Sequence, residues 1–227
     1  MITGHLLTSE LWKAQEQYLR LHYPCILQEI PEAETIREMA TLILDQVPEQ
    51  FFLAGLSMGG MIAFEILRFA PERVLKLALC DTTPGPETME RSSQRTEFLQ
   101  NAQQQGFEYT IKQQWIDLMF SKEGRKRKEL PQAVMHMASK IGFERCQQQV
   151  RALMARKDSR EYLTSIACPT LVVCGGEDVL TPPEIHKEMI EKIPNANLKL
   201  IPDCGHLTPL EAPDQVNALM FEWLNEA

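Results

Sequence analysis

The segment Gly55-Leu56-Ser57-Met58-Gly59-Gly60 limits the possible folds of this chain more than any other feature of its sequence. The short apolar run 51–54 precedes it and is typical of a buried strand. The stretch 58–69 follows and is apolar on nearly all sides, which predicts a helix packed against a sheet. A serine in a sharp strand-to-helix turn needs glycines two residues before and after it, because side chains there would collide. This context predicts that Ser57 is an exposed nucleophile.

Other apolar runs alternate with amphipathic stretches along the chain. Buried strands are also predicted for residues 74–80, 170–174, 198–201 and 23–30, and helices for 36–47 and 213–224. Strands that alternate with helices indicate an α/β fold with a mostly parallel sheet and helices on both faces. The length of 227 residues suits one such domain that carries an insertion.

Residues 84–165 break the alternation, since they are rich in glutamine, methionine and charge and contain no convincing strand. Helical spacing recurs within 111–119, 134–141 and 150–154. We therefore predict a core made of residues 1–83 and 166–227, with a helical cap over 84–165 that governs substrate choice. Ordinary surface helices are the alternative. Trp115, Met119 and Phe120 suit an apolar pocket wall, but packing within the insertion is the favoured interpretation.

A serine is a weak nucleophile unless a base takes its proton. His206 follows the strand predicted over 198–201, so it is expected in a loop at the carboxyl end of the sheet, where α/β proteins place their sites. His22, His136 and His186 lie in helical or amphipathic surroundings and are expected at the surface.

A catalytic histidine needs a carboxylate that orients its ring. Asp178 directly follows the strand predicted over 170–174 and is the favoured candidate. Glu177 is its neighbour and is expected to face solvent. Asp81 ends the strand predicted over 74–80 and is the second alternative.

The composition excludes several other classes of protein. The net charge of −8 makes nucleic acid an unfavourable partner, and no apolar run is long enough to span a membrane. Six scattered cysteines without a C-x-x-C pair predict reduced thiols and no zinc site. The start of the chain lacks the pattern of a secretory signal, so a cytoplasmic location is expected. No feature of the pattern specifies an oligomeric state.

Three segments resemble the α/β-hydrolase fold family: the turn at Ser57, the stretch 168–183, and Cys204-Gly205-His206. The order Ser57, Asp178, His206 is also that of the family. The resemblance, which is greatest to small bacterial esterases and to the enol-lactonase and C–C hydrolase branches, implies a serine hydrolase without cofactor or metal. Its substrate would be a small carboxylic ester or lactone, cleaved through an acyl-enzyme. The alternatives are C–C bond hydrolysis or a lyase step by the same triad, and a non-catalytic binding protein on the same scaffold.

The family binds the oxyanion with two backbone N–H groups, and the resemblance carries both to this chain. Met58 follows the nucleophile and supplies the first. The early loop Gly4-His5-Leu6-Leu7 supplies the second, through the backbone of His5 or, alternatively, of Leu6. Relatives place at least one strand before this loop, where this chain has only residues 1–3. The N-terminal strands are therefore predicted to be shortened or missing, unless the protein begins further upstream.

Overall fold

The computed structural model describes residues 1–226, and its centre is one parallel sheet. The sheet has the order β1-β2-β3-β4 and consists of β1 (Phe51–Leu56), β2 (Val74–Cys80), β3 (Thr170–Gly175) and β4 (Ala196–Ile201). Each strand pairs in parallel with the next one along the chain. The predicted α/β fold with a parallel sheet is confirmed.

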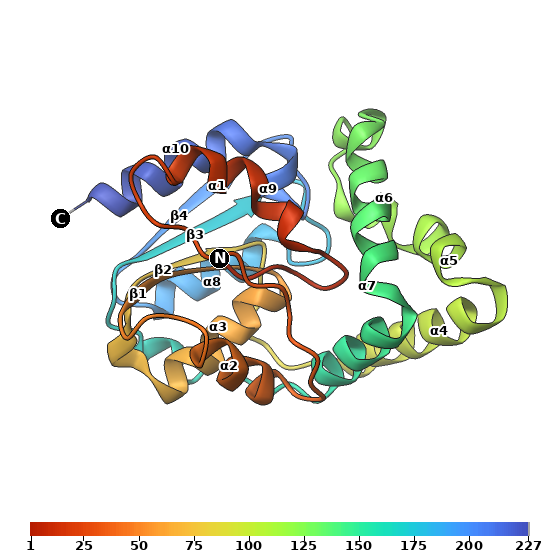
Figure 1. Cartoon of the computed structure of the whole chain (residues 1–227), viewed down its shortest axis with the longest axis horizontal. Coiled ribbons are helices and arrows are strands. Elements are labelled where there is room, and N and C mark those ends of the chain that lie inside the picture. The colour runs from red at the N-terminus through yellow and green to blue at the C-terminus, as the bar shows by residue number, and fades with distance from the viewer. Residues whose placement is uncertain (227) are drawn as a thin grey trace.

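Helices cover both faces of this sheet (Figure 1). One face carries α1 (Lys13–Leu19), α9 (Thr208–Glu211) and α10 (Pro213–Asn225), and the other carries α2 (Ile36–Leu44), α3 (Met58–Phe69) and α8 (Pro183–Lys192). Side chains of β2 alternate between the two layers, as a strand requires: Ala78 and Cys80 face the first, and Leu77 and Leu79 face the second. Burial on both faces explains why these strands are continuous apolar runs.

The N-terminal segment differs from the prediction of a strand over 23–30. Ile2 forms isolated parallel bridges to Gly55 on one side and to Gln28 on the other. Its backbone N–H donates to the carbonyl of Ala54 (2.8 Å), and the N–H of Gln28 donates to the carbonyl of Met1 (2.8 Å). Because the segment that pairs with Gln28 is a stub of three residues, it supports a single bridge there and no regular strand.

Four helices between β2 and β3 lie on the side of the sheet where the strands end (Figure 1). We call them the cap helices: α4 (Met89–Gln105), α5 (Phe107–Gln114), α6 (Ile116–Met119) and α7 (Glu129–Met154). Gly142 has a positive φ of 74° and bends α7. Phe98 and Val134 of the cap helices share an apolar cluster with Trp12 and Trp223, so one continuous core joins the cap helices to the helices over the sheet.

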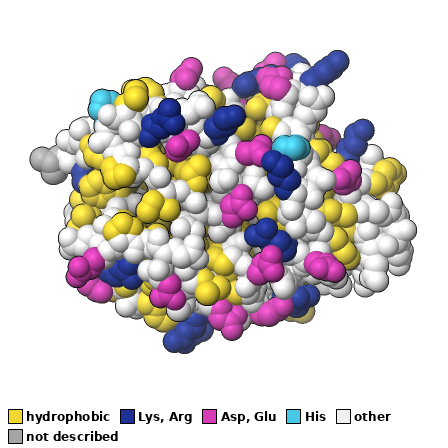
Figure 2. All heavy atoms as spheres, viewed as in Figure 1, with side chains coloured by type: hydrophobic (Ala, Val, Ile, Leu, Met, Phe, Trp, Pro, Cys, Tyr) yellow, Lys and Arg dark blue, Asp and Glu magenta, His cyan; other side chains and the backbone are white. Residues whose placement is uncertain are grey.

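Four short 3₁₀ helices complete the chain, at Ser9–Trp12, Pro71–Arg73, Gly124–Lys126 and Leu163–Ser165. Acidic, basic and apolar side chains are interspersed over the face shown in Figure 2. All six cysteines are free thiols. Within residues 1–226, no helix combines the length and the apolar character that a membrane span needs.

Candidate active site

Ser57 stands at the turn between β1 and α3 in a strained backbone conformation, with φ 52° and ψ −113°. The surrounding structure holds this turn: the N–H of Ser57 donates to the carbonyl of Cys80 (2.9 Å), and the Thr82 hydroxyl donates to the carbonyl of Ser57 (2.6 Å). A Cβ atom at Gly55 would lie 2.4 Å from the carbonyl oxygen of Gly59, and one at Gly59 would lie 2.5 Å from that of Ile2. Both glycines are therefore required for the tight passage of the chain.

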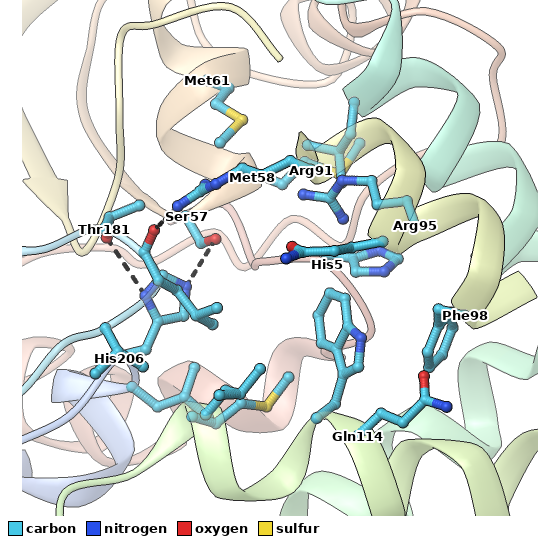
Figure 3. A pocket seen from close by; sticks show the side chains of 18 of the residues that line it. His5, Ser57, Met58, Met61, Arg91, Arg95, Phe98, Gln114, Thr181 and His206 are labelled. Carbon is cyan, nitrogen blue, oxygen red and sulfur yellow. Dashed lines mark hydrogen bonds between the residues drawn. The ribbon is translucent and has the colours of Figure 1, made fainter. Parts of the chain in front are cut away.

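The ring of His206 lies between Ser57 and Asp178. Its Nε2 is 2.9 Å from the Ser57 hydroxyl oxygen, and its Nδ1 is 2.8 Å from Asp178 Oδ2. Figure 3 shows Ser57 and Thr181 on the two sides of this ring. The backbone N–H of His206 donates to the carbonyl of Met119 (3.0 Å), so the cap helices help to hold its loop.

Asp178 is buried and fully hydrogen-bonded. Its Oδ1 accepts the N–H groups of Leu180 (2.8 Å) and Thr181 (3.0 Å), which closes the loop after β3 into an Asx-type turn. Its Oδ2 accepts the Thr181 hydroxyl (2.7 Å) as well as the His206 ring. Sequence reasoning did not identify Thr181, although a hydroxyl three residues after an aspartate in a turn is a recognisable signal.

The contact between Asp178 and His206 shifts the pKa of each residue in the direction opposite to the effect of burial. Burial alone would raise the pKa of Asp178, but the charge and hydrogen bond of His206 outweigh it and lower that pKa. Burial alone would lower the pKa of His206, but the Asp178 carboxylate raises it. This arrangement stabilises a positively charged imidazole, as a base that accepts a proton from serine requires.

The two alternative carboxylates point elsewhere. Asp81 accepts the N–H of Gly175 (3.0 Å) and the hydroxyl of Thr208 (2.6 Å), and burial together with the Asp178 charge raises its pKa to about 8. Glu177 accepts the backbone N–H of Lys122 (2.9 Å). Among these three carboxylates, Asp178 is the one in hydrogen-bond contact with the His206 ring.

The prediction of a surface position is wrong for one of the three remaining histidines. His186 is fully buried, whereas His22 and His136 are exposed. The Nε2 of His186 accepts the N–H of Thr82 (3.1 Å), and its Nδ1 lies 3.2 Å from the carbonyl of Pro182. The His186 ring therefore connects α8 to the end of β2. Burial lowers the pKa of His186, which keeps this bridging ring neutral.

The early loop brings the backbone of His5 to the same site. The N–H of Leu6 donates to the side-chain oxygen of Gln149 on α7 (3.0 Å), and this bond removes Leu6 as a free donor. The backbone N–H groups of His5 and Met58 have no acceptor within residues 1–226. The His5 ring also binds Gln149, through Nδ1 (2.8 Å), and burial followed by the Arg95 charge lowers its pKa to about 3. The ring is therefore neutral, and sequence reasoning did not identify Gln149.

These groups open into a cavity of about 890 Å³ between the sheet and the cap helices (Figure 3). Its wall includes Ser57, Met58, His206 and Leu7 from the core, and Arg91, Arg95, Trp115 and Met119 from the cap helices. Trp115 and Met119 pack against other residues of the insertion, as expected, and both also line this cavity. Phe120 is buried in the apolar cluster, and its backbone passes close to Gly205.

A cluster of ligand-type atoms lies beneath the site. Atoms of Asp81, Cys174 and Asp178 are within 4.8 Å of one another. Both carboxylates are already saturated with donors from the protein, and burial raises the pKa of the Cys174 thiol, so it stays protonated. These residues therefore fit a hydrogen-bonded support of the histidine better than an ion site.

Known proteins resemble this chain in sequence and fold. The alpha/beta hydrolase fold family matches residues 12–213. Pimeloyl-[acyl-carrier protein] methyl ester esterase from Nitrosospira multiformis is 26% identical over 95% of this chain and 89% of its own. A thermophilic esterase from Thermogutta terrifontis, solved with malate bound, is 29% identical with a TM-score of 0.88 over 98% of this chain and 87% of its own.

The fold is also that of the enol-lactonase from Burkholderia xenovorans, at 20% identity and a TM-score of 0.88 over 99% of this chain and 90% of the other. The resemblance to small esterases and an enol-lactonase, expected from the sequence, is confirmed. The chain belongs to the alpha/beta hydrolase fold family and is a hydrolase of that fold.

Proposed function

We propose that this protein hydrolyses a carboxylic ester with Ser57 as nucleophile, His206 as base and Asp178 as the carboxylate that orients the base. The observation that carries the proposal is the unbroken contact from Ser57 Oγ to His206 Nε2 (2.9 Å) and from His206 Nδ1 to Asp178 (2.8 Å). This relay ends at the wall of a cavity large enough for a small-molecule substrate.

The reaction has two halves. Ser57 Oγ attacks the ester carbonyl carbon while its proton moves to His206 Nε2, and the alcohol leaves with that proton. Water then gives a proton to the same nitrogen and attacks the acyl-enzyme, which releases the acid and restores the serine hydroxyl. Asp178 keeps the ring in the required tautomer and stabilises its charged form in both halves.

The backbone N–H groups of His5 and Met58 would bind the oxyanion that forms at each attack. Neither group has an acceptor among residues 1–226, and Met58 opens α3, so its N–H also lies at the positive end of that helix. One such donor is worth roughly 3–4 kcal/mol in the transition state. The competing assignment to Leu6 is weaker because Gln149 already accepts its N–H.

The names of the relatives support an ester or a lactone as the substrate. The Nitrosospira relative is a methyl ester esterase, and the Thermogutta neighbour is an esterase. A small-molecule ester is therefore the partner that we propose for the cavity.

Replacement of Ser57 by alanine tests the nucleophile. We expect Ser57→Ala to lose ester hydrolysis to below about one per cent of the wild-type kcat, because removal of a triad member costs several powers of ten. The variant should also fail to react with a fluorophosphonate probe, and its melting temperature should change little. Probe labelling that persists in Ser57→Ala would identify another nucleophile, and a wild-type protein that neither reacts nor turns over esters would support a binding protein instead.

A further inference from the structure

Two arginines on the cap side of the cavity have no part in the proposed ester cleavage. Arg91 and Arg95 are four residues apart on α4, so they share one face of the helix, and both line the cavity. Figure 3 shows Arg95 beside His5, whereas Arg91 reaches toward the loop that carries Thr181, where it donates to the carbonyl of Leu180. Like charges at this spacing repel each other, so the arrangement carries a cost in stability that calls for a reason.

The charges of these arginines are only partly balanced within residues 1–226. Arg95 Nε pairs with Glu87 Oε1 (2.9 Å), but the other oxygen of Glu87 is bound by Arg156. Arg91 donates to a neutral acceptor, the carbonyl of Leu180. The guanidinium groups of Arg95 and Arg156 therefore share one buried carboxylate, and Arg91 has no carboxylate partner within the described residues. Two further carboxylates at the cavity, Glu90 and Glu97, are exposed to solvent.

One donor nitrogen of this group is buried without a partner. Nη1 of Arg95 has no acceptor in the described structure, and the Arg95 side chain is only 14% exposed. A buried donor of a charged group costs free energy until an acceptor meets it. Burial, followed by the charge of Arg91, lowers the pKa of Arg95 to about 10, so the group is still a cation at neutral pH. The neutral ring of His5 beside it does not add to the positive charge.

We propose that Arg95, assisted by Arg91, binds a carboxylate of the substrate, so that the enzyme acts on esters carrying a second, anionic group. The inference rests on the proposed esterase function and names its substrate class. The ester carbonyl lies at Ser57 while the carboxylate lies under α4 and supplies the acceptor that Arg95 Nη1 lacks. Guanidinium groups suit this task because their planar donors match the two oxygens of a carboxylate.

Matched substrate pairs test the inference in the wild-type protein. The mono-4-nitrophenyl esters of succinate, glutarate and adipate carry the charge in the acyl part, and the acetate ester of 4-hydroxybenzoate carries it in the alcohol part. Each is compared with its neutral carboxamide isostere at constant ionic strength. For at least one pair we expect kcat/KM to favour the anion about ten- to hundredfold, mostly through KM, as a hydrogen bond to a charged group provides.

Variants assign this preference to the arginines. In Arg95→Gln and Arg91→Gln, the anion-to-amide ratio of the best pair should fall about tenfold. Arg95→Lys keeps the charge without the planar donors and should give an intermediate ratio. Arg151→Gln is the matched control, because Arg151 lies on a cap helix but is half exposed and pairs with Glu34 outside the cavity. It should keep the wild-type ratio.

The outcomes separate the two proposals. Turnover with an anion-to-amide ratio near one in every pair, or an unchanged ratio in a folded Arg95→Gln, overturns the anion site and leaves the esterase in place. If no ester is turned over, the esterase proposal fails, and the anion site is then judged by the melting temperature of the wild type. Glutarate should raise that temperature and neutral glutaramide should not, and an equal effect of the two overturns the site. If Arg95→Gln does not fold, the comparison of glutarate with glutaramide on the wild-type protein takes the place of the variant kinetics.

Discussion

Single residues of this site differ in role because their surroundings differ. Asp178 and Asp81 are both buried carboxyl groups at the carboxyl ends of strands. Asp178 faces the imidazole, which lowers its pKa, whereas burial and the Asp178 charge raise the pKa of Asp81 to about 8. Asp81 also joins the end of β3, through Gly175, to the loop after His206, through Thr208. We therefore expect the Asp178 carboxylate to serve the chemistry and the Asp81 carboxyl group to hold the two loops together.

Substitution by asparagine should separate these roles. Asp178→Asn should lower kcat by about a thousandfold or more with a small change in stability, because an amide no longer stabilises the charged ring in its required tautomer. In Asp81→Asn, the amide NH₂ must face a backbone N–H of either Gly175 or Thr208. We expect a loss of about 1–3 kcal/mol in the free energy of unfolding and a much smaller loss of rate.

Denaturant unfolding and ester turnover, measured on both variants, check this prediction. Glu177→Gln is the control, since Glu177 binds the backbone of Lys122 rather than the histidine. An active Asp178→Asn beside an inactive, folded Asp81→Asn would reverse the assignment.

The protonation of His206 should govern the pH dependence of the rate. Its pKa is raised by Asp178, and the base is effective only when neutral, so kcat/KM should rise with pH through a value above the usual histidine pKa of about 6.5. Asp178→Asn removes the cause of that shift and should move the remaining profile to lower pH. The measurement is kcat/KM from about pH 5 to about pH 9. A profile that is flat over this range contradicts a histidine base.

At the scale of elements, α7 supports the early loop through one side chain. The Gln149 oxygen accepts both the Leu6 N–H (3.0 Å) and the His5 ring (2.8 Å), and these bonds hold the loop from which His5 lines the cavity. Gln149→Leu leaves both donors without an acceptor. We expect it to cost about 1–3 kcal/mol in stability and to lower kcat more than it changes KM.

Gln149→Glu distinguishes hydrogen bonding from simple packing. It keeps an acceptor oxygen at the same place, so it should recover part of the kcat that Gln149→Leu loses. Steady-state kinetics and melting temperatures of both variants provide the measurement. If the two variants lose kcat equally while both stay folded, Gln149 does not act through the loop.

The elements that the sequence predicted well are those whose signals are local. The turn at Ser57, Asp178 after β3 and His206 after β4 each depend on a few adjacent residues, and the structure brings all three together. Contacts between distant segments carry no such signal. Gln149 meets Leu6 across 143 residues of sequence, and His186 is buried because α8 packs against the end of β2. The predicted strand over 23–30 failed for the same reason, since its pairing depends on the short stub at Ile2.

At the scale of the whole molecule, the cap helices and the loop of His206 form one assembly. The carbonyl of Met119 accepts the N–H of His206 (3.0 Å). Buried Glu211 accepts the N–H of Gly205 (3.0 Å) and also binds Ser121, so it joins the histidine loop to the segment after α6. The apolar cluster runs without a break from the cap helices to the helices over the sheet. The sequence did not indicate these contacts, because all three candidate catalytic residues lie outside the insertion.

Removal of the cap segment should therefore destroy the site as well as the substrate pocket. A variant in which residues 86–162 are replaced by a short linker loses the Met119 and Ser121 contacts to the histidine loop and the Gln149 support of the early loop. It also removes the cap-helix members of the shared apolar cluster and so exposes apolar side chains of the remainder. We expect no cooperative melt and fluorophosphonate labelling at least about a hundredfold slower than in the full chain. Ser121→Ala in the full chain is the graded control and should keep the fold with a partial loss of rate. A deletion variant that melts cooperatively and is labelled at the wild-type rate would show that the core positions the triad unaided.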